Sequence, residues 1–209
     1  MTVRELYTKT RQTLQAGCIE DDAQEARLLL CHFLRMTPAE MYLAADQDTG
    51  NADIRVLPAA EKRREHYPLQ YILGEWPFMG MTLSVGEGVL IPRDDTEVLV
   101  RAVIERLAGH NRPKGLDLCA GSGAVGLGLC SVLPDSEIEA IERYPQAFSY
   151  LTRNCEAQPG YAVTPVQGDI TDRAFCARFQ NGCYDFIVSN PPYVTQAEMH
   201  TLQPEIGHE

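Results

Sequence analysis

Strand and helix patterns alternate along the second half of this chain, and this alternation restricts the fold more than any other feature. Short apolar runs separated by helical patterns begin near residue 115, at Leu116–Leu118, Ile138–Ile141, Val163–Val166 and Tyr184–Val188. Repeated strand–helix units predict an α/β fold with a parallel sheet and helices on both faces. Ligands of such sheets bind beyond the carboxyl ends of the strands.

Polar residues and glycines follow the predicted strands at the edge where a ligand would bind. Gly121, Glu142, Asp169 and Asn190 each come directly after a strand, so one crevice can hold all four. The segment from Gly121 to Gly126 matches G-x-G-x-x-G, and Glu142 lies 19 residues beyond Gly123. Glycines let the backbone approach a nucleoside, and a carboxylate accepts hydrogen bonds from both ribose hydroxyls. The sequence therefore predicts a nucleoside cofactor.

Two cofactors fit this pattern, NAD and S-adenosylmethionine (SAM). Asp117 precedes the glycines and is suited to the ammonium group of SAM, and Asp169 offers an acceptor to the adenine amine. These two acids favour SAM. An NAD-dependent oxidoreductase is the weaker alternative, because no residue of the pattern supplies an acid or base for hydride transfer.

The fourth strand runs into a rigid polar turn, Asn190-Pro191-Pro192-Tyr193. Each proline restricts the residue before it, so Asn190 is held extended. The Asn190 side-chain oxygen and the Pro191 carbonyl can accept the two hydrogens of a planar N–H₂ group, and Tyr193 can stack on it. The pattern predicts a clamp for a planar amide or a base amine, with direct methyl transfer to the held nitrogen. A plain proline turn is the alternative for the tetrapeptide alone.

The first half of the chain is helical and then irregular. Residues 1–67 predict a small helical domain that recognises or packs against a partner, with capping boxes at Thr2 and Thr37. Residues 68–92 predict a linker and a β-hairpin that turns at residues 85–88. Residues 93–209 form the predicted catalytic domain. It opens with a helix capped by Asp94 or Asp95, whose inward residues are expected to be Val98, Leu99, Val103, Ile104 and Leu107. Arg93 either joins the capping network or faces the site.

Composition limits the partners and the compartment. The formal net charge of -11 argues against a large nucleic-acid footprint, and Lys62-Arg63-Arg64, the best basic cluster, is more typical of a solvated helix face. Seven cysteines without a C-x-x-C, and five histidines without ligand spacing, predict neither disulfides nor a metal site. With no signal peptide or membrane span in the pattern, we expect a cytoplasmic protein.

At this point the sequence resembles the HemK/PrmC family of protein-glutamine N5-methyltransferases. Asn-Pro-Pro-Tyr alone is shared with adenine-N6 and guanine-N2 methyltransferases, and the N-terminal segments narrow the choice. The resemblance covers nearly the whole chain and is carried by the helical N-terminal region, Pro68–Gly74, Ile91–Glu97, Leu116–Gly123 and Asn190–Tyr193.

The resemblance implies a class I SAM-dependent methyltransferase (Rossmann-like) domain preceded by a helical domain. The implied substrate is the glutamine of the Gly-Gly-Gln motif in peptide-chain release factors, with no direct binding of nucleic acid or membrane. Asn190, Pro191 and Tyr193 would be catalytic, and Pro192, Phe78 and Arg93 would help to bind the glutamine. The implied SAM pocket consists of Asp117, Cys119, Ala120, Gly121, Ser122, Gly123, Glu142, Asp169, Ile170 and Asn190.

The chain departs from the family pattern in three places. Cys119 stands where the family often has glycine, and Glu142 where it often has aspartate; both keep the needed chemistry. Methyltransferases of this class have seven strands, and only four are predicted here, so the C-terminal strands are expected to be missing. A ribosomal-protein glutamine methyltransferase, a nucleic-acid amine methyltransferase and a non-catalytic SAM-binding fragment therefore stay open as alternatives.

Overall fold

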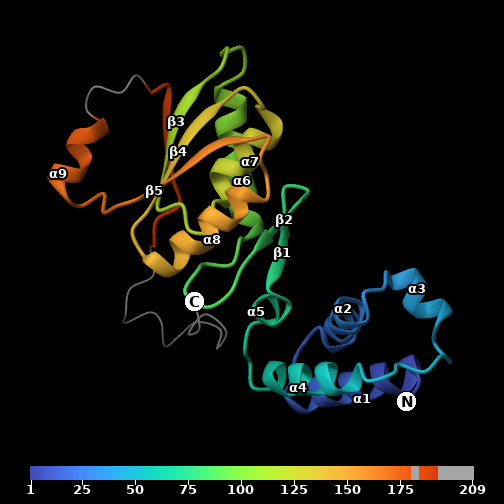
Figure 1. The fold of residues 1–209 in the computed structure, drawn as a ribbon. Helices are drawn as coiled ribbons and strands as arrows, with labels where there is room; N and C mark the ends of the chain where they lie inside the picture. Colours follow the sequence, from blue (N-terminus) through green and yellow to red (C-terminus); the bar gives the residue numbers. More distant parts are fainter. Residues whose placement is uncertain (180–183, 193–209) are drawn as a thin grey trace. The chain divides into compact units, whose positions relative to one another are not determined.

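The computed structural model describes residues 1–179 and 184–192 and divides the chain into two compact units (Figure 1). The first unit comprises residues 1–73, and the second begins at Gly74.

The first unit is helical. Its elements are α1 (Val3–Ala16), α2 (Asp22–Leu34), α3 (Pro38–Leu43), α4 (Asp53–Arg64) and α5 (Leu69–Leu73). The predicted capping boxes of α1 and α3 are confirmed, because Thr2 and Thr37 each accept the N–H of the glutamate three residues on. Helix α5 lies in the segment predicted as a linker. Its Leu69 is buried in the core formed with α1, α2 and α4, so the helical unit extends further than the sequence pattern indicates.

A buried ion pair joins α2 to α4 in this unit. Arg63 is only 7% exposed, and its Nε and Nη2 atoms donate to the two carboxylate oxygens of Glu25 at 2.6 and 3.1 Å. Beside it, Arg64 pairs with Glu61, and the Lys62 ammonium lies over the Tyr67 ring. The middle arginine of the basic cluster is therefore an internal structural residue, and the cluster is not a continuous cationic surface.

The second unit begins with a β-hairpin whose position differs from the prediction. Strand β1 (Glu75–Phe78) pairs antiparallel with β2 (Met81–Ser84). The connecting residues Met79 and Gly80 both have positive φ, 48° and 77°, as a two-residue hairpin turn of type I′ requires. The prediction that the hairpin turns at residues 85–88 is thus wrong, because the turn in that segment follows β2 and does not join two strands. That segment instead passes over helix α8, where a Cβ on Gly86 would overlap the Tyr150 hydroxyl.

A four-stranded parallel sheet forms the centre of the second unit. Its strands are β3 (Lys114–Leu118), β4 (Glu137–Glu142), β5 (Ala162–Gln167) and β6 (Phe186–Ser189), in the order β5-β4-β3-β6. Asp117 lies opposite Ala140 on one side and Val188 on the other. Pro165 lies within β5, which has β4 as its sheet neighbour. The sheet confirms the α/β class and the parallel pairing expected from the sequence.

In the described part of the chain, one face of this sheet is covered by α6 (Asp94–Arg106), α7 (Ala124–Val132) and α8 (Pro145–Glu156) (Figure 1). Arg93, not Asp94 or Asp95, is the N-cap of α6. Both acids therefore lie in the first turn, where their negative charges interact favourably with the positive end of the helix dipole. Val98 is 65% exposed, contrary to the prediction, because the inward stripe of α6 passes through Val100.

The opposite face of the sheet is more open. Helix α9 (Arg173–Cys176) and the 3₁₀ turn η1 (Ala177–Phe179) lie on that side (Figure 1), and Ile187 of β6 is 64% exposed. Before β6, the Tyr184 hydroxyl donates to Glu139 at 2.8 Å. The helix predicted near residues 196–202 lies outside the described residues.

Candidate functional site

The glycine loop between β3 and α7 has an unusual backbone. Cys119, Gly121 and Gly123 have φ values of 61°, 55° and 84°, all in the left-handed region. The loop is held by two main-chain bonds, from Ala120 N–H to the Ile141 carbonyl and from Gly123 N–H to the Ala120 carbonyl. A left-handed conformation costs a non-glycine residue roughly 1–2 kcal/mol, so Cys119 stores strain at the start of the loop.

Glu142 closes β4 and binds this loop directly. Its carboxylate accepts the Gly121 N–H at 2.9 Å through one oxygen and the Tyr144 N–H at 2.8 Å through the other. The residue is 6% exposed. Each carboxylate oxygen can accept more than one hydrogen bond, so both oxygens can also accept from hydroxyl groups.

Asp117 is a buried carboxyl group behind the loop. It is 1% exposed, and its Oδ2 accepts the Gly126 N–H of α7 at 3.0 Å. Its Oδ1 has no hydrogen-bond partner among the described residues. Burial, reinforced by the negative charge of Glu142 and opposed by the Gly126 N–H, raises the pKa of Asp117 to about 7. A cationic group beside Oδ1 would stabilise the ionised form.

Asn154 of α8 fixes the other side of the loop, which sequence reasoning missed. Its Nδ2 donates to the Ser122 carbonyl at 2.8 Å and to the Ser84 carbonyl at 3.1 Å. Its Oδ1 accepts the Ser84 N–H at 2.7 Å. The side chain is buried with both amide groups satisfied, so it joins helix, hairpin and glycine loop.

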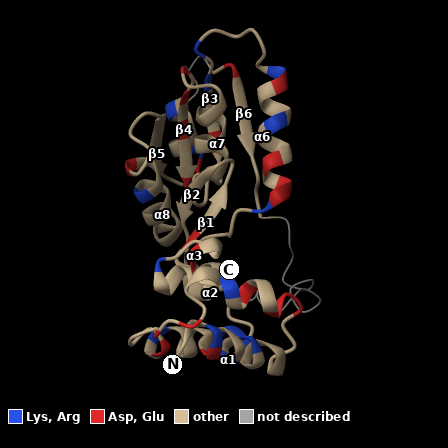
Figure 2. Cartoon of the chain, turned by 90° about the vertical axis from the view of Figure 1, so that its right-hand side faces the viewer, with Lys and Arg blue, Asp and Glu red and all other residues tan. Residues whose placement is uncertain are grey.

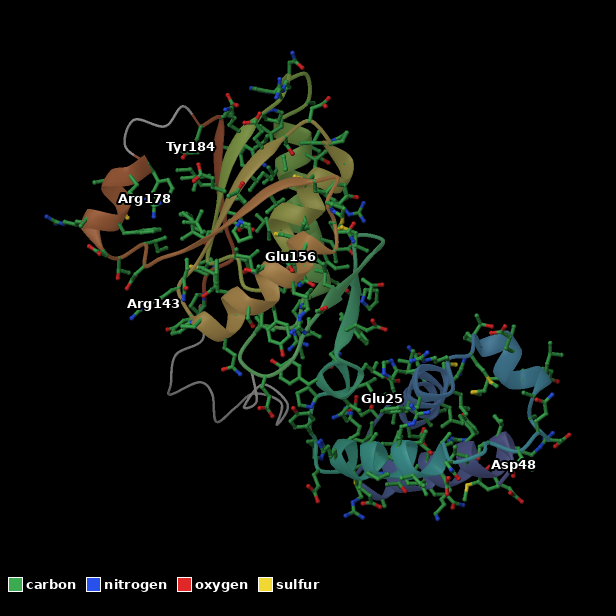
Figure 3. The ribbon with its side chains drawn as sticks, in the orientation of Figure 1. Glu25, Asp48, Arg143, Glu156, Arg178 and Tyr184 are labelled. Carbon is green, nitrogen blue, oxygen red and sulfur yellow. The ribbon has the colours of Figure 1, made fainter. Side chains whose placement is uncertain are left out.

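Asp169 follows β5 and is already engaged by protein groups. Its Oδ1 accepts both the side-chain hydroxyl and the N–H of Thr171, and these bonds lower the pKa of the carboxyl group. Its Oδ2 pairs with Arg143 at 3.3 Å, at the carboxyl ends of the strands and far from Tyr184 (Figure 3). Ile170 is half-buried, and its carbonyl accepts the Cys176 thiol.

Asn190 follows β6 and contacts the first turn of α6. Its Nδ2 donates to the Thr96 hydroxyl at 3.2 Å, and Thr96 is 6% exposed. The end of β6 and the beginning of α6 lie side by side (Figure 2). Just before it, the Ser189 hydroxyl donates to the Leu118 carbonyl at 2.7 Å. Pro191 and Pro192 are exposed, and Tyr193 lies outside the described residues.

Of two predicted substrate-binding residues, Phe78 is buried and Arg93 is exposed. Phe78 is 3% exposed and packs against Gly128 of α7, where a Cβ would come within 3.1 Å of its ring. In this conformation Phe78 is a core residue. Arg93 is exposed at the start of α6, three residues before Thr96.

Comparison with known proteins identifies the family. Residues 5–74 match the model described as the PrmC N-terminal domain, and residues 94–206 match the methyltransferase small domain. The release factor glutamine methyltransferase of Deinococcus radiodurans is 32% identical over 210 residues, which cover 100% of this chain and 73% of that protein. The protein of the same name from Thermodesulfovibrio yellowstonii is 35% identical over 185 residues, 88% of this chain and 64% of that protein.

The chain belongs to the release factor glutamine methyltransferase family. Membership makes it a methyltransferase whose methyl donor is SAM, and it confirms the predicted family and fold class. The chain spans 64 to 73% of the length of these two relatives. Among solved structures, a Thermus thermophilus 16S rRNA N2 G1207 methyltransferase in complex with AdoMet and guanosine aligns at a TM-score of 0.47 and 24% identity. That alignment covers 58% of this chain and 33% of the other.

The residues present fit the cofactor of the release factor glutamine methyltransferases. The side of Gly121 is open, since a Cβ built there would meet only Val89, at 3.9 Å. The carboxylate of Glu142 lies against this glycine, and the buried Asp117 Oδ1 has no hydrogen-bond partner among the residues that the structure describes. Within residues 1–179 and 184–192, no cluster of His, Cys, Asp or Glu could hold a metal ion. No helix in the same ranges is long and apolar enough to cross a membrane.

Proposed function

We propose that this chain transfers a methyl group from SAM to the side-chain amide nitrogen, N5, of the glutamine in the Gly-Gly-Gln motif of peptide-chain release factors. The names of its relatives supply the release factor as the substrate class. The observation that carries the proposal is the position of Asn190 at the end of β6. This strand pairs with β3, and the glycine loop follows β3 directly.

The cofactor-binding role falls to the groups at the carboxyl ends of β3, β4 and β5. Glu142 would accept the ribose hydroxyls, and the residues from Cys119 to Gly123 would line the cofactor with their main chain. Asp117 would face the ammonium group, and Asp169 with Ile170 the adenine. The direct bond from Gly121 to Glu142 and the ion pair of Arg143 with Asp169 support one connected pocket.

The substrate-holding role falls to Asn190 and the prolines after it. An amide nitrogen is a poor nucleophile, because its lone pair is delocalised into the carbonyl group. Accepting its two hydrogens at the Asn190 Oδ1 and the Pro191 carbonyl would turn that lone pair towards the methyl group. When bound, SAM supplies an electrophilic methyl group on a sulfonium. Tyr193 and Pro192 would complete the holding surface, with Arg93 beside it, and the proton would leave to water after transfer.

The helical unit would recognise the domain of the release factor that carries the glutamine. Its surface charge is mixed, and Arg63, the middle residue of the basic cluster, is neutralised internally by Glu25. A nucleic-acid substrate would need a cationic channel for its phosphates, and a net charge of -11 opposes one. We therefore prefer a protein glutamine to a nucleobase.

Radiolabelled SAM with purified substrates tests this function. The chain is incubated in parallel with a release factor, a variant of that factor with alanine for the Gly-Gly-Gln glutamine, ribosomal proteins, DNA and RNA. We expect label only in the unmodified release factor. Label in nucleic acid, or label that persists in the alanine variant, contradicts the proposal. A homologue that spans the full family length serves as the positive control.

A further inference from the structure

A buried hydroxyl group faces the side-chain amide of Asn190. Thr96 lies in the first turn of α6, and its Oγ1 accepts the Asn190 Nδ2 at 3.2 Å. The two residues are 94 positions apart in the chain. This contact joins the beginning of a helix to the end of a strand at the proposed transfer site.

The surroundings of Thr96 hold its hydroxyl in place. Its neighbour Glu97 accepts the Met79 N–H of the hairpin turn at 3.1 Å and pairs with Arg101 one helical turn on at 3.0 Å. Val100, one turn after Thr96, is fully buried and would be 3.4 Å from a Cβ on Gly128 of α7. The first turn of α6 is thereby fastened to both the hairpin and the neighbouring helix.

The orientation of the Asn190 amide decides what it can bind. An asparagine side chain carries an acceptor on one side and donors on the other. With Nδ2 against Thr96, Oδ1 is the atom left for another ligand. The reverse orientation would present N–H groups to the N–H₂ group of a substrate amide, so donor would meet donor.

We propose that Thr96 is a positioning residue that holds the Asn190 side chain through its Nδ2, with Oδ1 left for the substrate amide. The inference rests on the proposed function and names a residue that positions its clamp. Thr96 itself does not contact the reacting atoms in this arrangement.

A pair of variants separates positioning from folding. Thr96→Val keeps the shape of the side chain and removes the hydroxyl, whereas Thr96→Ser keeps the hydroxyl. We expect single-turnover transfer to fall roughly tenfold in Thr96→Val, the effect of one net hydrogen bond, and to stay within about threefold in Thr96→Ser. The dissociation constant of SAM should be unchanged in both. Equal loss of transfer in the two variants overturns the inference.

A second readout needs no substrate. In nitrogen-15 spectra, the side-chain amide of Asn190 is assigned as the signal lost in Asn190→Ala. We expect its hydrogen exchange to accelerate several-fold in Thr96→Val and to be retained in Thr96→Ser. Unchanged exchange in Thr96→Val overturns the inference even if no release factor is methylated. Absence of methylation by the parent chain, with the exchange difference present, contradicts the proposed function and leaves the Thr96 contact established.

Discussion

The side-chain nitrogen of Asn154 and the main-chain oxygen of Ser122 are 2.8 Å apart, and this bond fixes the glycine loop from the side of α8. The same amide group also bonds both main-chain polar groups of Ser84 at the end of β2. One buried side chain therefore determines how the hairpin and the loop sit against each other.

Replacing Asn154 with alanine should damage cofactor binding and stability together. The change leaves the buried Ser122 carbonyl and two half-buried main-chain groups of Ser84 without their partner, so we expect the free energy of unfolding to fall by about 2 kcal/mol. SAM should bind more weakly because the loop is no longer held. Urea unfolding and calorimetric titration measure the two effects. Ser149→Ala, on the exposed side of the same helix, is the control and should change neither.

Glu142→Ala should weaken SAM binding by roughly 1.5–3 kcal/mol, the usual value for hydrogen bonds to a charged group. The substitution also removes the hydrogen bond that the Glu142 carboxylate accepts from the Gly121 N–H. Titration calorimetry gives the dissociation constant. Glu137→Ala, at the opposite end of β4, should leave it unaltered. If both variants bind SAM like the parent, Glu142 has no ribose role.

Asn190→Ala should leave SAM binding largely intact and reduce methyl transfer by at least about a hundredfold, in line with the loss of one preorganised polar contact. A single-turnover assay with excess enzyme isolates the chemical step. Asn51→Ala, on the surface of the helical unit, provides a matched asparagine deletion. Transfer that survives in Asn190→Ala would remove the clamp from the mechanism.

The buried carboxyl group of Asp117 should make the fold less stable as pH rises from about 4 to about 7. Its folded pKa is near 7 and its ordinary value is 3.8, so in this window the folded state binds the proton that the unfolded state has lost. The contribution is at most about 1.4 kcal/mol per pH unit. Urea unfolding at pH 5 and pH 7.5 should show a smaller difference for Asp117→Asn than for the parent. Equal differences in both proteins would mean that Asp117 ionises normally.

Arg63→Ala should destabilise the helical unit strongly. The largely buried Glu25 carboxylate would lose both hydrogen bonds from Arg63, a change that costs about 3–5 kcal/mol. Arg4→Ala removes an exposed pair with Asp46 and should cost about 1 kcal/mol or less. Thermal unfolding of the two variants compares them directly, and similar melting temperatures would argue against an internal role for Arg63.

The order of strands and helices in the second unit could be read from the sequence, because apolar runs and glycines mark each change. The hairpin could not. Proline is unusual within a strand, and β1 contains Pro77. Gly86 and Gly88 suggested the hairpin turn, but the strands pair before them and both glycines lie against α8. The actual turn contains Met79, a residue that rarely adopts a left-handed conformation.

The residues that position the site were also beyond sequence reasoning. Glu142 and Asn190 follow predicted strands, so their place at one edge of the sheet could be deduced. Thr96 and Asn154 act through contacts with partners up to 94 positions away, and their residue types are ordinary for helices. Such contacts depend on how α6 and α8 pack, which no local pattern encodes.

Pro165 lies in β5, at one end of the strand order, and affects where a further strand could pair with the sheet. Proline has no main-chain N–H to donate, and within sheets it is confined to edge strands or bulges. The outer side of β5 is therefore a poor template for another strand. The four residues of β6 all have N–H groups, so an added strand pairs more readily beside β6, next to Asn190, than beside β5. A new neighbour there would lie at the sheet edge that carries Asn190, the proposed substrate-binding residue.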